Sequence, residues 1–370
     1  MRNPFYYGGL VRNEFFCNRI DELSELKEDI LNGINVLIYA PRRFGKTSLV
    51  LKALDELKQD NFKFAFLDLM NIATIDEFIN RYFNTITKTL NEPTDKIISF
   101  FRNFIKLRPN INVSFDSSGN PSFSLSLNQE DKNKTLEEVL NIPFLLAQNG
   151  KKIVIVFDEF QEIEHLNMEN TMRSVIQAHT NCVAYIFMGS KKHLLTQIFM
   201  DKKRAFYKSV KHLVIKEIKE YSWREFIQAK FKETNKEISN HFVSEIIKIT
   251  KGFPYYTQLI AYELWNQCEI EVNDAIFNQA IKIALDREEN LFLLELDNLT
   301  QNQKKLLKIL THNPTNLYNE QLLAQYQLKI GSIQVALLGL IKKDIIDKRN
   351  KEYYFCDPLF EYYLKFVQKL

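Results

Sequence analysis

The segment INVLIYAPRRFGKTSLV, residues 34–50, decides the fold. Its apolar first part is typical of a short strand buried on both faces, and its last part begins a helix with apolar residues at helical spacing. Between them stands Ala-x4-Gly-Lys-Thr, which has the spacing of a phosphate-binding loop with alanine where glycine is usual. That alanine lies at the end of the strand, where one methyl group is a small obstacle. Gly45 is the demanding position, because its backbone must adopt angles that a Cβ disfavours.

The spacing of this loop predicts a site for a nucleotide with Mg²⁺. Backbone N–H groups curl around the β-phosphate, Lys46 reaches the β/γ oxygens, and the Thr47 hydroxyl binds the metal. A charged surface turn is the alternative, but the placement between a strand and a helix favours the nucleotide. Arg42 and Arg43 occupy positions whose side chains usually point away from phosphate, so structural or partner contacts are favoured for them. The residues predicted to bind the nucleotide here are Ala40, Pro41, Arg42, Arg43, Phe44, Gly45, Lys46, Thr47 and Ser48.

A pair of acidic residues follows a second apolar run, IVIVFDEF. Asp158 leaves the end of this predicted buried strand, where it can hold the Mg²⁺ shell. Glu159 follows directly and can polarise a water molecule for attack on the γ-phosphate. The second carboxylate favours hydrolysis, since a phosphate-loop kinase needs only the first acid. The alternative for the pair is a helix cap after a strand.

Three further residues are candidates for catalysis. Ser190 follows the apolar run CVAYIFMG and can sense the γ-phosphate through a hydrogen bond, although an ordinary strand-to-helix turn explains it equally well. Arg204 and Lys208, in DKKRAFYKSVKHL, can supply a cation to the transition state, in cis or into a neighbouring subunit. A basic solvated loop is the equal alternative for that segment.

The pattern of the chain predicts an α/β fold with a parallel sheet and crossover helices. The runs FKFAFLDL, KKIVIVFDEF, CVAYIFMGS and HLVIKEI read as strands separated by helices. Two helical segments, near residues 74–90 and 94–107, precede a predicted hairpin at residues 111–127. At 370 residues the chain is too long for one ordinary core. The predicted domains are an α/β nucleotide domain at 1–218 with an insertion at 91–150, a helical lid at 219–298 and a winged-helix-like domain at 299–370.

The C-terminal region combines a winged-helix pattern with positive charge. Three short helical segments precede an alternating hairpin and a closing helix, and the region holds 11 Lys and Arg against 6 Asp and Glu. DNA binding is one inference. The third helix is largely apolar, however, and recognition of bases needs several polar side chains. A protein-contact or autoinhibitory module is therefore favoured, and non-specific phosphate contact remains open through Lys342, Lys343, Lys348, Arg349 and Lys351.

The remaining composition excludes several classes of protein. The four cysteines and six histidines show neither metal spacing nor a disulfide framework. The N-terminus MRNPFYYGGL lacks the apolar core of a signal peptide. No apolar run approaches the roughly 18 residues needed to span a bilayer. A cytoplasmic protein without a membrane segment is therefore expected.

Several of these motifs together resemble the archaeal-type ATPase family, within the AAA+/STAND division of P-loop NTPases. The likeness rests on the entry segment NPFYYGGLVRNEFFCNRIDELSEL, the double-arginine loop APRRFGKTSL, the acidic strand VFDEFQEI, the turn GSKKHLL and the segment TKGFPYYTQLIAYELW. It implies ATP with Mg²⁺ and an all-helical lid after the sheet. It also implies that Phe16, Arg19, Gly252 and Pro254 lie near the adenine.

This resemblance implies an ATPase, and two departures from the family pattern favour a slow one. Lys208 stands where an arginine is expected, and the helix after Pro254 holds no Arg or Lys before Trp265. We therefore expect an ATP-binding, slowly hydrolysing or partner-stimulated switch with an unidentified protein partner. ATP-dependent homo-oligomerisation is a further option. The alternatives are a DNA-binding initiator or regulator acting through residues 299–370, and a nucleotide-binding module whose hydrolysis is incidental.

Overall fold

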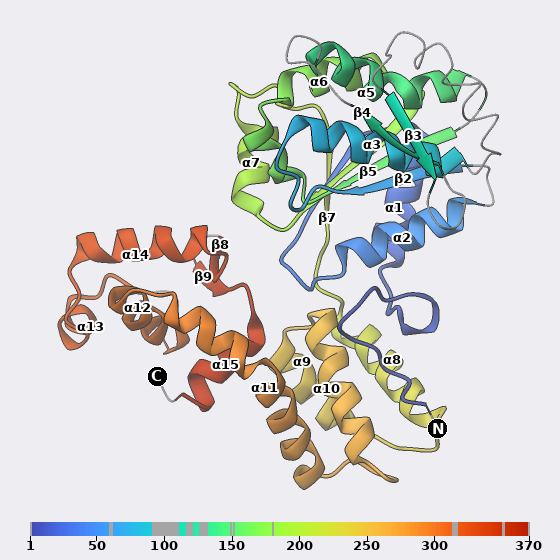
Figure 1. The fold of residues 1–370 in the computed structure, drawn as a ribbon. Coiled ribbons are helices and arrows are strands. Elements are labelled where there is room, and N and C mark those ends of the chain that lie inside the picture. Colours follow the sequence, from blue (N-terminus) through green and yellow to red (C-terminus); the bar gives the residue numbers. More distant parts are fainter. Residues whose placement is uncertain are drawn as a thin grey trace. The chain divides into compact units, whose positions relative to one another are not determined.

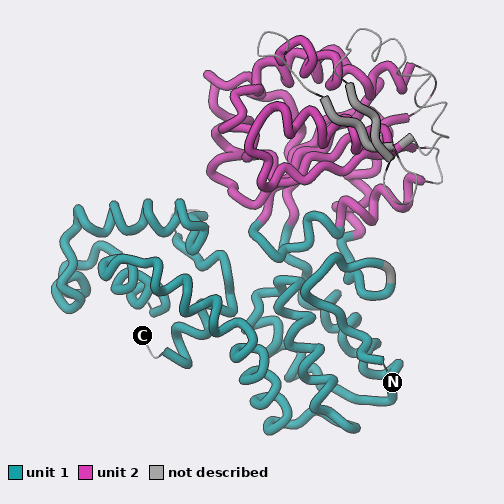
Figure 2. The backbone as a smooth tube through the Cα atoms, in the orientation of Figure 1, with its two compact units in different colours: residues 1–19, 41–48, 216–370 teal, residues 20–40, 49–215 magenta. Residues whose placement is uncertain are grey.

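The computed structural model describes residues 2–58, 62–90, 111–115, 121–125, 132–148, 150, 152–179, 181–312, 317–349 and 352–368. The chain forms two compact units (Figure 2). We call residues 20–40 and 49–215 the sheet unit, and residues 1–19, 41–48 and 216–370 the helical unit. The segment predicted to bind phosphate, residues 41–48, thus groups with the helical unit. The three-domain division with bounds at residues 218 and 298 stays a prediction.

A five-stranded parallel sheet forms the centre of the sheet unit (Figure 1). Tyr39 pairs with Gly189 and Asp68 pairs with Asp158, so the carboxyl ends of these strands meet at one edge. Strand residues 183–189 are buried throughout, as their unbroken apolar run predicted. The predicted α/β parallel sheet is confirmed. In spatial order the strands are β2 (Phe62–Asp68), β5 (Lys152–Asp158), β6 (Val183–Gly189), β1 (Val36–Tyr39) and β7 (Lys211–Val214).

Helices connect and cover the strands of the sheet unit. They are α1 (Ile20–Leu31), α2 (Lys46–Leu57), α3 (Ile75–Leu90), α5 (Lys132–Gln148), the 3-10 helix η4 (Phe160–Leu166), α6 (Glu169–Ala178) and α7 (Lys192–Met200). Helix α5 lies within the predicted insertion and yet shares the main core, because Leu136, Val139 and Leu140 are fully buried there. The predicted hairpin is confirmed as antiparallel β3 (Ile111–Phe115) and β4 (Pro121–Leu125). The helix predicted near 94–107 lies outside the described residues.

The helical unit contains the predicted lid and the winged-helix pattern. The N-terminal segment packs on the lid, since Phe5 is 2% exposed and its ring lies 5.6 Å from that of Phe231. The order of three helices, hairpin and helix confirms the winged-helix prediction. The elements of the whole helical unit are η1 (Asn13–Phe15), α8 (Glu220–Lys232), α9 (Asn240–Thr250), α10 (Pro254–Gln267), α11 (Asp274–Asp297), α12 (Gln301–His312), α13 (Glu320–Gln325), α14 (Ile330–Lys342), β8 (Ile346–Arg349), β9 (Glu352–Phe355) and α15 (Pro358–Phe366).

A buried histidine makes the stability of the sheet unit depend on pH. His179 is 1% exposed, with Nδ1 2.7 Å from the Tyr185 hydroxyl and Nε2 2.9 Å from Asn141 Oδ1. Burial lowers the pKa of His179 to about 4 from its ordinary 6.5. The unfolded chain therefore takes up this proton first as the pH falls. The full stability is present above pH 6.5 and is lost between pH 6.5 and about 4.

We expect the free energy of unfolding to fall by about 2 kcal/mol through His179 when the pH is lowered from about 7.5 to 5. Urea unfolding at these two pH values measures the loss. The variant His179→Gln cannot take up the proton, so its unfolding free energy should fall by less. Equal decreases in both proteins would contradict the role of His179.

Candidate functional site

The loop after β1 has the backbone that phosphate binding requires. Gly45 has φ +86°, a left-handed conformation that other residues rarely adopt. A Cβ at this position would lie 3.9 Å from Cγ of Pro254, an ordinary contact, so conformation and not space calls for glycine. Lys46 begins helix α2 and is 7% exposed, and its Nζ donates to the Pro41 carbonyl at 3.1 Å. A lysine curled over a loop at the N-terminus of a 12-residue helix fits the phosphate groups of a nucleotide.

The loop is anchored by the packing of its own Phe44 and by hydrogen bonds from Arg19. Phe44 is 3% exposed and its ring meets that of Phe253 edge to face at 4.8 Å. Arg19 is 4% exposed and donates to the carbonyls of Phe44 at 3.0 Å and Lys216 at 2.8 Å. Its guanidinium also lies 5.2 Å from the centre of the Phe44 ring. The family resemblance implied that Arg19 and Pro254 lie near the adenine; in the structure both lie against the loop, and contact with the adenine stays a prediction.

The second arginine of the loop binds the helices of the lid. Arg43 donates to Glu288 Oε2 at 2.6 Å and to the Tyr256 hydroxyl at 2.9 Å. Its guanidinium lies 4.4 Å from the centre of the Tyr255 ring. Burial lowers the pKa of Arg43, but Tyr256 and Glu288 outweigh this effect and raise the pKa above its ordinary value. Arg42, in contrast, is exposed. Glu288 was missed by sequence reasoning, because nothing local marks a partner 245 residues away.

The acidic pair lies at the carboxyl edge of the sheet. Asp158 ends β5, and its Oδ1 accepts from the Glu159 N–H at 3.0 Å. Glu159 is left-handed, with φ 50° and ψ 45°. Its Oε2 accepts from the Ser190 hydroxyl at 3.0 Å and from Gln161 Nε2 at 2.5 Å. The structure thus brings together two predicted catalytic residues, Glu159 and Ser190, and two donors orient the carboxylate.

Gln161 is a residue of this cluster that sequence reasoning missed. It is 2% exposed, and its amide lies over the backbone of Gly189. A Cβ at Gly189 would come within 2.2 Å of Gln161 Oε1, so only glycine allows this approach. The glycine before Ser190 was the available signal. It indicates that another side chain packs closely against this strand end.

The two predicted cations differ in their surroundings. Arg204 pairs with Glu169 at 2.6 Å and with Glu164 at 2.9 Å. The hydrogen bond to Glu169 is the main reason that the pKa of Arg204 is raised. Lys208 is exposed, with its Nζ 5.4 Å from the centre of the Tyr207 ring. The catalytic roles of Arg204 and Lys208 stay predictions.

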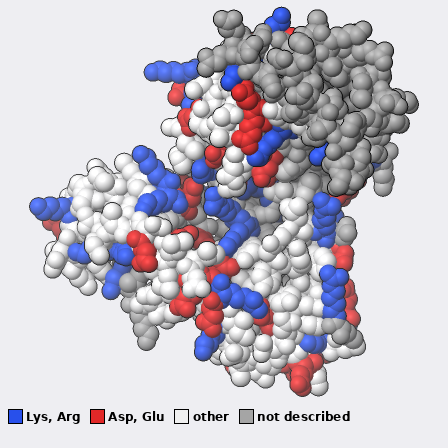
Figure 3. All heavy atoms as spheres, in the orientation of Figure 1, with Lys and Arg blue, Asp and Glu red and all other residues white. Residues whose placement is uncertain are grey.

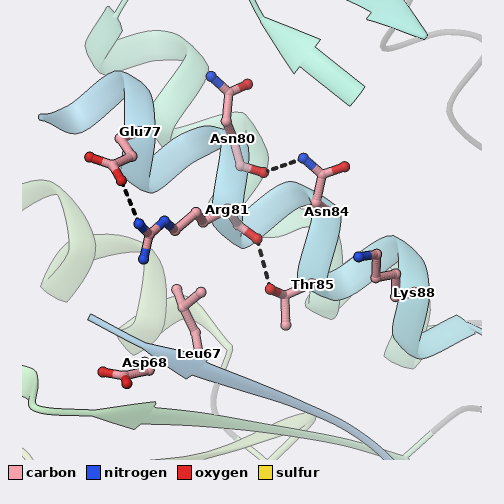
Figure 4. A pocket seen from close by; sticks show the side chains of 8 residues that line it. All are labelled: Leu67, Asp68, Glu77, Asn80, Arg81, Asn84, Thr85 and Lys88. Atoms are coloured by element: carbon pink, nitrogen blue, oxygen red, sulfur yellow. Dashed lines mark hydrogen bonds and ion pairs between the residues drawn. The ribbon is translucent and has the colours of Figure 1, made fainter. Parts of the chain in front are cut away.

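A polar cavity of about 660 Å³ lies along α3 in the sheet unit (Figure 4). Its polar side chains bond mainly along their own helix: Arg81 pairs with Glu77 at 2.6 Å, and the Thr85 hydroxyl donates to the Arg81 carbonyl at 2.7 Å. Such bonds stabilise a helix surface and converge on no ligand. We therefore centre the nucleotide site on the loop and not on this cavity. The cavity is lined by Leu67, Asp68, Glu77, Asn80, Arg81, Asn84, Thr85 and Lys88.

The chain belongs to the family of ATPase domains found predominantly in Archaea. The model of this family matches residues 16–260, which is more than half of the chain. A second model, for a probable winged helix domain, matches residues 291–366. In the described ranges, no helix combines the length and the apolar character that crossing a membrane requires.

Solved structures share this fold over nearly the whole chain, and a curated relative matches about half of it in sequence. The Walker-type ATPase of Pyrococcus abyssi has a TM-score of 0.69 at 19% identity, covering 96% of this chain and 97% of its own. The ORC2 protein of Aeropyrum pernix, solved with ADPNP and ADP, has a TM-score of 0.56 at 13% identity, covering 96% of both chains. An ATP-binding protein of Methanocaldococcus jannaschii is 26% identical over 200 residues, 53% of this chain and 54% of its own. The chain thus spans about half the length of this curated relative.

Substitution of Arg19 separates a loop contact from a base contact. Because Arg19 holds the loop through two carbonyls, Arg19→Ala should weaken ATP and inorganic tripolyphosphate alike, by about tenfold or more. Calorimetric titration with each ligand and Mg²⁺ measures this. Arg12→Ala, at an exposed arginine of the same segment, should change neither affinity. A loss confined to ATP would instead favour contact between Arg19 and the adenine.

Proposed function

We propose that this member of the archaeal ATPase family is a slowly hydrolysing switch that couples its nucleotide state to contact with a protein partner. The observation that carries the proposal is the loop of residues 40–48, with left-handed Gly45 and a buried lysine at the start of α2. This backbone fits a nucleoside triphosphate. The matched family supports ATP as that nucleotide.

Two residues of the phosphate loop and both residues of the acidic pair have a role in this proposal. Lys46 neutralises charge on the β- and γ-phosphates, and Thr47 and Asp158 hold Mg²⁺, which when bound neutralises developing charge on the phosphates. Glu159 accepts a proton from the attacking water. The geometry of the sheet supports this assignment, because β5 ends in Asp158 at the same edge where β1 ends before Ala40.

A slow basal rate follows from the surroundings of Glu159. Its carboxylate already accepts from Ser190 and Gln161, and a carboxylate bound to two side-chain donors is less ready to take a proton from water. The sequence adds Lys208 where an arginine is expected. A partner or a nucleotide that draws Ser190 away would release the base. This arrangement supports a switch over a fast motor.

Glu159→Gln tests the hydrolytic part of the proposal. The amide keeps the shape but cannot take the proton, so ATP affinity should be retained and turnover should fall at least about tenfold. Phosphate release and calorimetry measure the two quantities. Glu162→Gln, which changes a neighbouring carboxylate paired with Lys191, should leave turnover unchanged. Equal turnover in wild type and Glu159→Gln would assign Glu159 a structural role.

Lys46→Ala should abolish tight ATP binding without unfolding the protein.

The exposed face of α14 supports a protein and not DNA as the partner. Ile330, Val335 and Leu338 are 51%, 72% and 61% exposed. This helix occupies the place of a recognition helix, which reads bases through polar side chains. Figure 3 shows surface over α14 that is largely free of Lys, Arg, Asp and Glu in this view. An apolar face of this kind fits the surface of another protein.

The basic residues near this helix are partly engaged within the chain. Lys343 donates to the Asn298 carbonyl, and Arg349 pairs with Glu217 at 3.5 Å. Lys351 lies outside the described residues. These contacts leave Lys342 and Lys348 as the better candidates for phosphate contact.

A protein partner predicts that duplex DNA binds no tighter than about 10 µM at physiological salt, the range of non-specific binding. Fluorescence anisotropy over a series of salt concentrations measures this affinity and its salt dependence. The double variant Lys342→Glu, Lys348→Glu is the comparison. Micromolar or tighter binding that is lost in the double variant would decide for DNA and against the protein partner.

A further inference from the structure

One phenol joins the phosphate loop to the last helix of the chain. The Tyr256 hydroxyl accepts from Arg43 at 2.9 Å and donates to Asp357 Oδ2. The other oxygen of the same carboxylate accepts the N–H groups of Leu359 and Phe360 at 2.9 and 3.0 Å. Asp357 thereby caps α15. The loop and the N-terminus of α15 are therefore separated by two side chains, Tyr256 and Asp357.

Because this connection is largely buried, none of its side chains can lose its partner alone without a large cost in free energy. Tyr256 is 1% exposed, and the Glu288 side chain that pairs with Arg43 is 5% exposed. Burial also raises the pKa of Asp357, which is a sign that its charge has lost water. A buried carboxylate without its donors is costly, so its partners have to move with it. Arg43 is the cation that these carboxylates share.

Arg43 is well placed to respond to the loop. It stands two residues before Gly45 and has φ +64°, an unusual conformation for a residue with a side chain. Its contacts with Glu288 and Tyr256 help to offset the strain of that conformation. A change in the backbone when phosphate groups bind would therefore act directly on these contacts.

Helix α15 passes its position on to the rest of the winged-helix module. Phe360 and Tyr363 pack on Phe292 of α11, at ring distances of 5.3 and 5.2 Å. Glu361 pairs with Lys251 at the end of α9. The helix also packs against α12 and β9 of the module. A shift of the α15 cap would thus reach the elements beside α14.

We propose that Arg43, Tyr256 and Asp357 form a relay that couples the nucleotide state of the loop to α15 and through it to the winged-helix module. The proposal rests on the proposed function, because it requires that the loop bind nucleotide. It adds the residues that carry the coupling. Arg43 acts in the relay as a positioning residue. The Tyr256 hydroxyl is the hydrogen-bonded bridge on which the coupling depends.

Hydrogen exchange of α15 tests the relay on the full chain. In the wild type, Mg²⁺-ATP should change the exchange rates of amides in Pro358–Phe366 by at least about fivefold. Tyr256→Phe removes the bridging hydroxyl, so the change should disappear while ATP affinity stays within about threefold of the wild type. Asp357→Asn retains a cap but loses the charge, and it should also uncouple the two sites. Tyr255→Phe is the matched control, since its hydroxyl bonds Glu288 at 2.8 Å instead of Asp357.

Each outcome separates the relay from the proposed function. A wild type that binds ATP without any change at α15 overturns the relay and leaves ATP binding intact. A Tyr256→Phe protein that keeps the wild-type change also overturns it. Loss of the change in both tyrosine variants would indicate general loosening of α10 and contradict the specific relay. A wild type that binds no ATP removes the proposed function and the relay with it.

Discussion

The half-buried ion pair between Arg43 and the buried Glu288 carboxylate is the interaction on which the form of the loop depends. It joins residues that lie 245 positions apart. It also holds Arg43, whose backbone has a left-handed conformation, beside the backbone that we propose binds phosphate. Phe44 packs on Phe253 of the lid, and its carbonyl accepts from Arg19 of the N-terminal segment, so the consecutive residues Arg43 and Phe44 are both held by the helical unit. The segment between Pro41 and Ser48 is therefore built by the helical unit as much as by the strand that precedes it.

This construction gives the nucleotide two kinds of neighbour. The residues that we propose to bind phosphate, above all Lys46, are presented by the backbone of the loop and the start of α2. The side chains of Arg43 and Phe44 are directed into ion pairing and packing with the lid. In the proposed switch, binding energy at the phosphates would act on the lid helices through these contacts.

The carboxylate of Glu159 at the edge of the sheet is also held in place by neighbouring side chains. Glu159 is held by Ser190 and Gln161 in a left-handed turn after β5. If Glu159 is the base, as we propose, these hydrogen bonds orient its carboxylate and also restrain it, which supports slow hydrolysis in the proposed function. The apolar face of α14 in the winged-helix module is the surface at which we propose that a protein partner binds.

The sequence by itself determined the sheet, the phosphate loop, the acidic pair and the winged-helix pattern, because each depends on local periodicity and spacing within a few residues. It also indicated that Arg43 makes structural contacts. It could not name Glu288, Tyr256 or Asp357 as a connected set, nor Gln161 as the neighbour of Glu159. Those contacts join residues on different elements, and their bonds form only when the helices pack and exclude water. The tertiary structure alone decided them, because a buried charge takes whichever partner the fold brings within reach.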